Sequence, residues 1–141
     1  QLSANVHIGD ITKLDKLDID SRFSLILDRG SLTHNCLIDF DSSLSSISTL
    51  LKSQGVFISY FFSNNHSSVV GATEISQSYF SNYTGGDFVD CPAPALFLSQ
   101  DQATKLFSKY FTITSLVELF SVNCTSDSQV SAMFECICTV Y

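Results

Sequence analysis

Apolar residues along this chain gather in short blocks, and each block predicts one element of secondary structure. The blocks at 23–27 and 56–62 are nearly continuous apolar runs, a pattern typical of strands buried on both faces of a sheet. Between them, residues 38–54 carry apolar side chains at near-helical spacing, with Gly55 where a helix should stop. Val6-His-Ile8 predicts a further short strand, and 14–21 a turn or short helix. This alternation favours a mostly parallel α/β sheet.

The second half of the chain begins with a long connection and closes with two strands. Residues 63–98 form that connection, in which a short helix is predicted around 73–80, and connections this long are usually functional or disordered. Ser99-Gln-Asp-Gln102 is a capping-box pattern that predicts a helix to about Tyr110. Segments 112–120 and 130–141 predict two strands. Their linker is too short for a helical crossover, so we expect them to be antiparallel neighbours.

Composition narrows the class of protein. At 141 residues the chain is one domain by length, and 45% hydrophobic with 15% charged residues fits strands buried on both faces. The formal charge is −7, and the seven Lys and Arg residues are scattered, which argues against a nucleic-acid or an anionic-membrane partner. No apolar run is long enough for a membrane span, and no signal peptide is recognisable at the start.

The cysteines favour a reducing, cytoplasmic location. Five are present, an odd number without a Cys-x-x-Cys pair: Cys36, Cys91, Cys124, Cys136 and Cys138. The last two alternate on a predicted strand and therefore share one face, where they are interpreted as small core residues. Metal ligation by this pair and a distant histidine is the alternative, and we predict no metal site.

The stretch that points most directly to function is Asp28-Arg29-Gly30, which ends the apolar strand at 23–27. In open α/β folds ligands bind just beyond the carboxyl ends of the strands, so a charge pair and a glycine there predict the rim of a ligand site. The alternative is an Asp–Arg pair that only ties down the loop after a buried strand.

Four segments, in order, resemble the later part of a class I S-adenosylmethionine-dependent methyltransferase. Val6-His-Ile-Gly-Asp10-Ile11 resembles the end of that family's third strand, and 23–34 resembles the motif at the end of its fourth. Leu50-Leu-Lys-Ser-Gln-Gly-Val-Phe-Ile-Ser59 is similar to its "LLKPGG" turn into the fifth strand, with Ser-Gln in place of Pro-Gly. The closing strand pair corresponds to its seventh strand inserted beside the sixth.

This resemblance implies a Rossmann-like sheet, mostly parallel with a C-terminal antiparallel hairpin, that lacks the family's first two strands. None of the six glycines forms the Gly-x-Gly turn that precedes the third strand in the family. We therefore expect residues 1–141 to be a partial methyltransferase domain, with a core at 23–141 and a substrate lid or insertion at 63–98. The missing elements would lie upstream of Gln1, and these residues alone should be inactive.

The resemblance also implies a set of cofactor-binding residues for S-adenosylmethionine. Asp10 would accept a hydrogen bond from the adenine amino group while Ile11 packs on the ring; a helix N-cap is the alternative role for Asp10. Asp28 would lie beneath the methionine part, Arg29 would pair with a carboxylate such as Asp28, and Gly30 would allow close backbone approach.

For the acceptor side, His34 is the candidate general base, since imidazole titrates near neutrality, and a solvated loop histidine is the alternative. Tyr60 and Phe62 could line the acceptor pocket or serve as core aromatics. Residues 63–98 contain no Lys or Arg, which favours a neutral or cationic small-molecule acceptor. The expected function is thus methyl transfer to a small molecule. The alternative is a non-catalytic scaffold or a dimerisation module, because missing strands would leave bare sheet edges for a homodimer or another segment.

Overall fold

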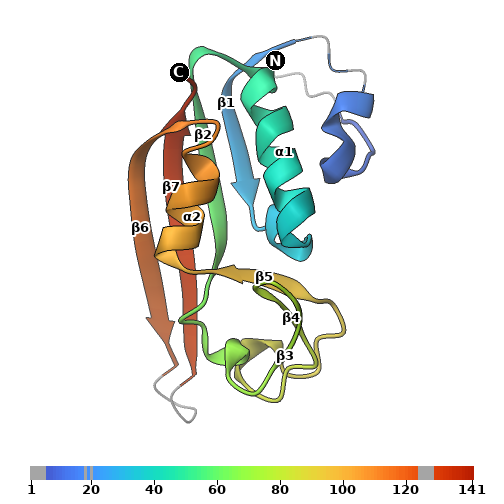
Figure 1. Cartoon of the computed structure of the whole chain (residues 1–141), viewed down its shortest axis with the longest axis vertical. Coiled ribbons are helices and arrows are strands. Elements are labelled where there is room, and N and C mark those ends of the chain that lie inside the picture. The colour runs from blue at the N-terminus through green and yellow to red at the C-terminus, as the bar shows by residue number, and fades with distance from the viewer. Residues whose placement is uncertain (1–5, 18, 20, 124–128) are drawn as a thin grey trace.

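The structure is a computed structural model, and it describes residues 6–17, 19, 21–123 and 129–141 (Figure 1). Cys124 lies outside the described residues. The strands and helices in chain order are β1 (Phe23–Arg29), α1 (Leu37–Leu50), β2 (Leu51–Ser63), β3 (Thr73–Ser76), β4 (Tyr79–Ser81), β5 (Ala95–Leu98), α2 (Gln100–Phe107), β6 (Thr112–Val122) and β7 (Val130–Thr139). Short 3₁₀ segments lie at Ile11–Lys16, Leu32–His34, Ser67–Val69 and Gly86–Phe88.

The sheet is organised around β2, which pairs with three other strands. β1 lies parallel to β2 on one side, and β7 lies antiparallel to β2 on the other. Beyond the end of β1, β5 pairs in parallel with the last residues of β2. The hairpin of β6 and β7 confirms the predicted antiparallel neighbours. The prediction of a mostly parallel sheet is wrong, because β3–β4, β4–β5, β2–β7 and β6–β7 are all antiparallel.

Both helices pack on one face of the sheet (Figure 1). The side chains that β2 and β7 turn toward the helices, among them Phe57, Phe61 and Phe134, are fully or almost fully buried. On the opposite face, Leu25 and Leu27 of β1 are 57% and 61% exposed. The prediction that β1 is buried on both faces is therefore not met in the described residues. Both described helices lie on the same face of the sheet, and neither covers the face that carries Leu25 and Leu27.

The junction between α1 and β2 differs from the prediction. The helix ends at Leu50, and β2 begins at Leu51 without a loop, so Gly55 is a buried residue inside the strand rather than a helix stop. A Cβ on Gly55 would lie 2.8 Å from the Lys52 carbonyl oxygen and 3.0 Å from that of Phe23. The glycine is therefore used for close backbone approach between β1 and β2, where the register also shifts.

Residues 64–98 form a small subdomain at the carboxyl ends of β1 and β2 (Figure 1). The helix predicted around 73–80 is instead the β3–β4 hairpin, whose turn residue Ser78 has a positive φ of 58°. The capping box at Ser99 is confirmed: its hydroxyl accepts from Gln102 N at 3.2 Å, and the Gln102 side chain accepts from Ser99 N at 2.9 Å. Gln102 Nε2 also donates to Ser78 Oγ at 2.7 Å, which fastens the hairpin to α2.

The described part of the N-terminal region packs beside α1 rather than in the sheet. Residues 6–10 have no regular secondary structure, so the strand predicted at 6–8 is absent. The turn or short helix predicted at 14–21 is found only in its first residues, because the 3₁₀ segment runs from Ile11 to Lys16. Ile11 and Leu14 pack on the core, and Ser43 Oγ donates to the Ile11 carbonyl at 3.4 Å. Within the described residues no helix is both long and apolar enough to cross a membrane.

Candidate functional site

The rim predicted at the end of β1 is organised by Asp28, which is only 5% exposed. Its Oδ1 accepts hydrogen bonds from Ser31 N at 2.9 Å and Leu32 N at 3.4 Å, while Oδ2 accepts from Ser59 Oγ at 3.0 Å. Ser59 lies on β2 directly opposite Asp28. The carboxylate therefore joins the loop after β1 to the neighbouring strand.

The surroundings of Asp28 act on its pKa in opposite directions. Burial raises the pKa of this carboxyl above its usual value, and the hydrogen bonds from Ser59, Ser31 and Leu32 oppose the rise. Gly30, with φ of +85°, turns the chain just after the strand, and a Cβ there would meet nothing within 4 Å. The turn conformation, rather than a crowded neighbour, is what requires glycine at this position.

Arg29 points to the opposite face of the sheet from Asp28, because successive side chains of a strand alternate. Among the described residues it forms no ion pair, so the predicted Asp28–Arg29 pair is not present. The residue opposite Arg29 on β2 is Tyr60, whose hydroxyl donates to Glu135 Oε2 on β7. This hydrogen bond is the main cause of a raised pKa for Tyr60. An open depression of about 480 Å³ on this face is lined by Leu27, Arg29, Tyr60, Leu119 and Met133.

His34 lies at the junction between the rim loop and the subdomain. Its side chain is exposed, and its ring meets that of Phe62 edge to face with centroids 6.3 Å apart. The Tyr79 hydroxyl donates to the His34 backbone carbonyl at 3.0 Å. The candidate base is thus held near the carboxyl end of β2, and its imidazole is open to solvent.

Phe62 belongs to an aromatic cluster that forms the interior of the subdomain. Its ring lies 4.9 Å from that of Phe88 and 5.3 Å from that of Phe97, measured between centroids. His66, 2% exposed, packs against the same rings at 5.3 Å from Phe88 and 5.6 Å from Phe97. Phe62 is thus partly buried and packs against this cluster, at the edge of the site.

The imidazole of His66 has polar partners on both nitrogens. Nδ1 accepts from Ser68 N at 3.2 Å, and Nε2 lies 3.8 Å from Asp87 Oδ2. Burial lowers the pKa of His66, and the Asp87 carboxylate partly offsets this effect. A neutral ring with its proton on Nε2 fits these contacts. Through them the His66 side chain joins the two 3₁₀ segments of the subdomain, Ser67–Val69 and Gly86–Phe88.

Asp10 and Ile11 lie apart from this rim, on the 3₁₀ segment beside α1. Asp10 Oδ1 accepts from Thr12 N at 2.9 Å and from Thr12 Oγ1 at 2.7 Å, and Oδ2 forms an ion pair with Lys13 at 3.1 Å. The hydrogen bonds from Thr12, followed by Lys13, lower the pKa of Asp10 to about 2. The geometry is that of the N-cap role. The carboxylate nevertheless remains exposed and charged, so it can still accept a further donor.

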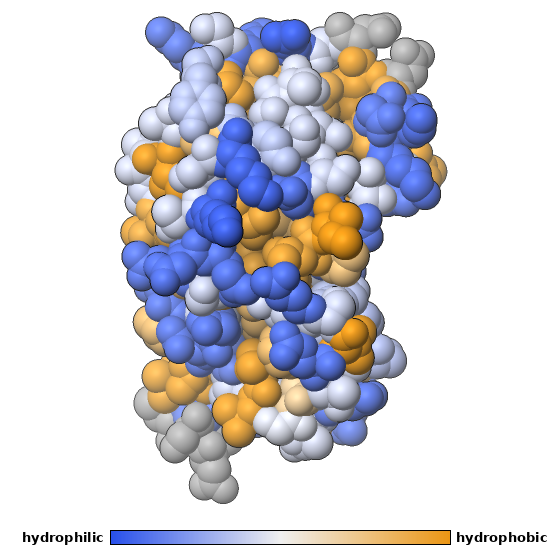
Figure 2. All heavy atoms as spheres, viewed as in Figure 1, coloured by the Kyte–Doolittle hydropathy of each residue, from blue (hydrophilic) through white to orange (hydrophobic). Residues whose placement is uncertain are grey.

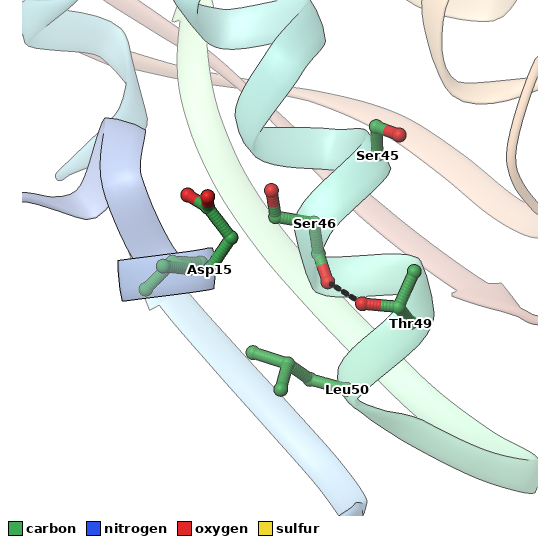
Figure 3. A pocket seen from close by; sticks show the side chains of 6 residues that line it. Asp15, Ser45, Ser46, Thr49 and Leu50 are labelled. Atoms are coloured by element: carbon green, nitrogen blue, oxygen red, sulfur yellow. Dashed lines mark hydrogen bonds between the residues drawn. The ribbon is translucent and has the colours of Figure 1, made fainter. Parts of the chain in front are cut away.

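A hollow of about 200 Å³ separates the 3₁₀ segment from α1 (Figure 3). It is lined by Leu14, Asp15, Ser45, Ser46, Thr49 and Leu50. One of the lining hydroxyls bonds its own helix, since Thr49 Oγ1 donates to the Ser46 carbonyl at 2.8 Å. The hollow lies along the later half of α1, away from the carboxyl ends of β1 and β2, and it contains none of the predicted site residues.

Three residues that organise the site escaped prediction: Ser59, Glu135 and Tyr79. Only Ser59 carried a usable signal, as the one serine in the apolar run 56–62. Glu135 and Tyr79 act through partners that are distant in sequence. Cys136 and Cys138 are buried on the helix-covered face, and no group of three metal-binding side chains occurs in the part of the chain that the structure describes.

Comparison with known protein families and with characterised sequences gives no match. Solved structures do match. A methyltransferase from Methanosarcina mazei superposes with a TM-score of 0.70 at 13% identity, over 95% of this chain and 66% of that one. An S-adenosylmethionine-dependent methyltransferase from Clostridium acetobutylicum gives a TM-score of 0.64 at 18% identity, over 99% and 65%. The 1,6-didemethyltoxoflavin-N1-methyltransferase of Burkholderia thailandensis was solved with S-adenosylhomocysteine. It gives a TM-score of 0.61 at 16% identity, over 90% of this chain and 48% of that one.

These similarities show the fold, which is the class I methyltransferase fold expected from the sequence. The chain spans 66%, 65% and 48% of these three structures, so at least a third of each has no counterpart in it. In this chain β1, β2, β7 and β6 are neighbours in that order, and β7 is antiparallel to both β2 and β6.

Proposed function

We propose that these residues form part of the catalytic domain of an S-adenosylmethionine-dependent methyltransferase that acts on a small molecule. The fold is the observation that carries the proposal, together with the names of the matched structures, several of which contain S-adenosylmethionine or S-adenosylhomocysteine. Methyl transfer from a sulfonium depends chiefly on alignment of donor and acceptor, so the absence of a catalytic triad among the described residues is compatible with it.

The described residues do not complete a cofactor site. The Asp28 oxygens are occupied by the rim loop and Ser59, and Asp10 lies on a different element with its own partners. Neither the hollow beside α1 nor the depression on the opposite face of the sheet is lined by Asp10, Asp28 or Gly30. In the proposed function Asp28 and Gly30 shape the rim, Asp10 presents a charged acceptor, and additional polypeptide supplies the rest.

The subdomain at 64–98 is proposed to cover the acceptor. Its charged side chains are the carboxylates Glu74, Asp87 and Asp90, all on exposed residues, which favours a neutral or cationic acceptor over an anionic one. His34 lies where the subdomain meets the rim, and its solvent-open imidazole could take a proton from an acceptor that must lose one.

Isothermal titration with S-adenosylhomocysteine tests the proposal. The natural protein that contains this chain should give saturable one-site binding, while residues 1–141 alone should give none. Asp10→Ala should weaken binding by roughly tenfold, the value of one charge-assisted hydrogen bond. Asp15→Ala, on the same 3₁₀ segment and 63% exposed in its side chain, is the matched control and should bind normally. Absence of binding by the natural protein would refute the proposal.

A further inference from the structure

Strand β6 forms one edge of the sheet. It is the last strand in the order β3-β4-β5-β2-β7-β6, and among the described residues it pairs with β7 alone (Figure 1). In an antiparallel pair, half of the backbone N–H and C=O groups of each strand point away from the other strand. From Ser115 to Ser121 the pairing of β6 with β7 is regular, so this stretch presents an ordered row of outward-directed backbone groups. Such a row is a template for pairing with another chain.

The sequence of β6 contains few of the features that protect exposed edges. Natural edge strands are usually short or carry lysine, proline or a bulge. Residues 112–122 contain no lysine, arginine or proline, and the irregularity in register is confined to 113–115. Leu119 and Phe120 are 45% and 56% exposed. Figure 2 shows apolar side chains near the end of β6, whereas hydrophilic side chains gather over α2.

The single charge of β6 is held away from the edge. It belongs to Glu118, whose Oε1 accepts hydrogen bonds from the Ser63 hydroxyl and from Asn65 Nδ2, the latter at 2.9 Å. Both donors lie at or just beyond the end of β2, which β7 separates from β6. The carboxylate is therefore directed toward the interior of the sheet and does not oppose an approaching strand.

The polypeptide that would complete the cofactor site is not expected at this edge. It must adjoin Asp28 and Gly30, which lie at the end of β1 and just after it. β1 and β7 pair with opposite sides of β2, so both β2 and β7 separate β1 from β6 (Figure 1). The edge of β6 is therefore available whether or not the cofactor site is complete.

From these features we infer that β6 pairs antiparallel with β6 of a second copy of the same chain. Two identical strands that pair antiparallel are related by a two-fold axis, so each supplies the backbone groups that the other needs. Charge favours this occupant. The whole chain carries −7 and repels its own copy over much of its surface, whereas β6 brings one carboxylate per copy, which is already directed inward.

The register of this pairing follows from the same strand. A two-fold axis at Glu118 would set two carboxylates directly opposite each other, which is unfavourable. An axis at Val117 would carry the pairing into the irregular segment 113–115. An axis at Leu119 keeps residues 117–121 of both copies within the regular part of the strand, and it sets each Glu118 opposite an uncharged residue. The contact leaves the carboxyl ends of β1 and β2 open and does not depend on methyl transfer.

Sedimentation equilibrium of the natural protein that contains this chain tests the inference. The parent should fit a monomer–dimer equilibrium. Leu119→Lys and Leu119→Glu should each weaken the dimer by roughly fivefold or more, because two like charges then face each other across the axis. An equimolar mixture of the two variants should recover the affinity of the parent, since opposite charges then face each other. Val70→Lys introduces a charge at a residue of the subdomain that is 77% exposed, and it should leave the dimer unchanged.

Hydrogen exchange provides a probe that needs no substitution. In the parent, the backbone amides of β6 that point away from β7 should exchange more slowly at high protein concentration than at low concentration. The amides of 67–72, in the subdomain, should exchange at the same rate at both. Circular dichroism must show that each variant is folded, and titration with S-adenosylhomocysteine separates this inference from the proposed function. The dimer should form whether or not the protein binds that ligand, and variants that lose the dimer should keep the ligand affinity of the parent.

Three results would overturn the inference. The first is a parent that stays monomeric at every concentration. The second is a dimer whose β6 amides exchange at the same rate at all concentrations, since its contact would then lie elsewhere. The third is a mixture of the two Leu119 variants that dimerises no more tightly than either variant alone.

Discussion

Replacing Asp28 with alanine removes the acceptor shared by Ser31 N, Leu32 N and Ser59 Oγ. The bonds from Ser31 and Ser59, at 2.9 Å and 3.0 Å, are the strong ones, and the one from Leu32 is 3.4 Å long. A buried donor left unpaired costs about 1–3 kcal/mol, and the relief of burying a charge offsets part of that. We expect Asp28→Ala to lower the free energy of unfolding by about 3 kcal/mol, a fall in Tm of roughly 10 °C.

Urea denaturation followed by circular dichroism measures this change, with an unaltered m-value as the sign that the unfolded state is the same. Asp28→Asn is the matched control, because its amide oxygen can still accept from the loop while Ser59 Oγ accepts from the amide. It should cost about 1 kcal/mol. An alanine variant as stable as the parent would show that Asp28 does not hold the rim loop. Weakened S-adenosylhomocysteine binding without a loss of stability would assign it to the ligand instead.

The pH dependence of the same variant pair gives an independent check. The raised pKa means that folded Asp28 keeps its proton to a higher pH than unfolded Asp28, whose pKa is near 3.8. In that window the folded state binds more protons, so the contribution of Asp28 to the free energy of unfolding falls as pH rises through it. Asp28→Asn lacks this proton and should show a correspondingly smaller decline with pH above 3.8. An identical pH profile for parent and variant would contradict the raised pKa.

Two further predictions concern the subdomain. Because burial lowers the pKa of His66 in the folded state, stability should fall as pH drops below about 6.5; His66→Gln should flatten that slope in denaturation curves measured from pH 8 to 5. Gly86 has φ of +71°, and a Cβ there would lie 2.6 Å from Ser68 N, so Gly86→Ala should destabilise by about 2 kcal/mol. A Cβ at Gly85 would have no atom within 4 Å, so Gly85→Ala should leave the stability nearly unchanged. Thermal denaturation of both variants measures the difference, and an equal loss of stability in the two would contradict a steric requirement for glycine at position 86.

Short sequence patterns were sufficient to predict those elements whose structure is set by residues close to them in the sequence. The capping box at Ser99, the helix over most of 38–54 and the C-terminal antiparallel pair could all be predicted from the sequence. Gly55 was misinterpreted because a glycine after a helical pattern has the same local signature whether it ends a helix or admits a neighbouring strand. The close approach of the Phe23 carbonyl, more than thirty residues earlier, decides between the two.

The same distinction explains the site. The position of Asp28 at the end of a strand followed from the apolar run that precedes it, but its partners did not. An Asp followed by Arg suggests a local ion pair, whereas alternation along β1 sends the two side chains to opposite faces. The register of β1 against β2 sets Ser59 opposite Asp28 and Tyr60 opposite Arg29, and the register of β2 against β7 sets Glu135 opposite Tyr60; no local pattern records either register. Tertiary pairing likewise converted the segment 73–80 into a hairpin.

The central place of β2 has a consequence for synthesis on the ribosome. One edge of this strand is completed by β1, which is made before it, but the other waits for β7, the last strand of the chain. Cys138 donates to the Phe57 carbonyl across 81 residues of sequence. Contacts this distant slow folding, since the loop must close before they form. Throughout that delay the nascent chain presents the unpaired edge of its central strand, the state in which chaperones and aggregation compete for it.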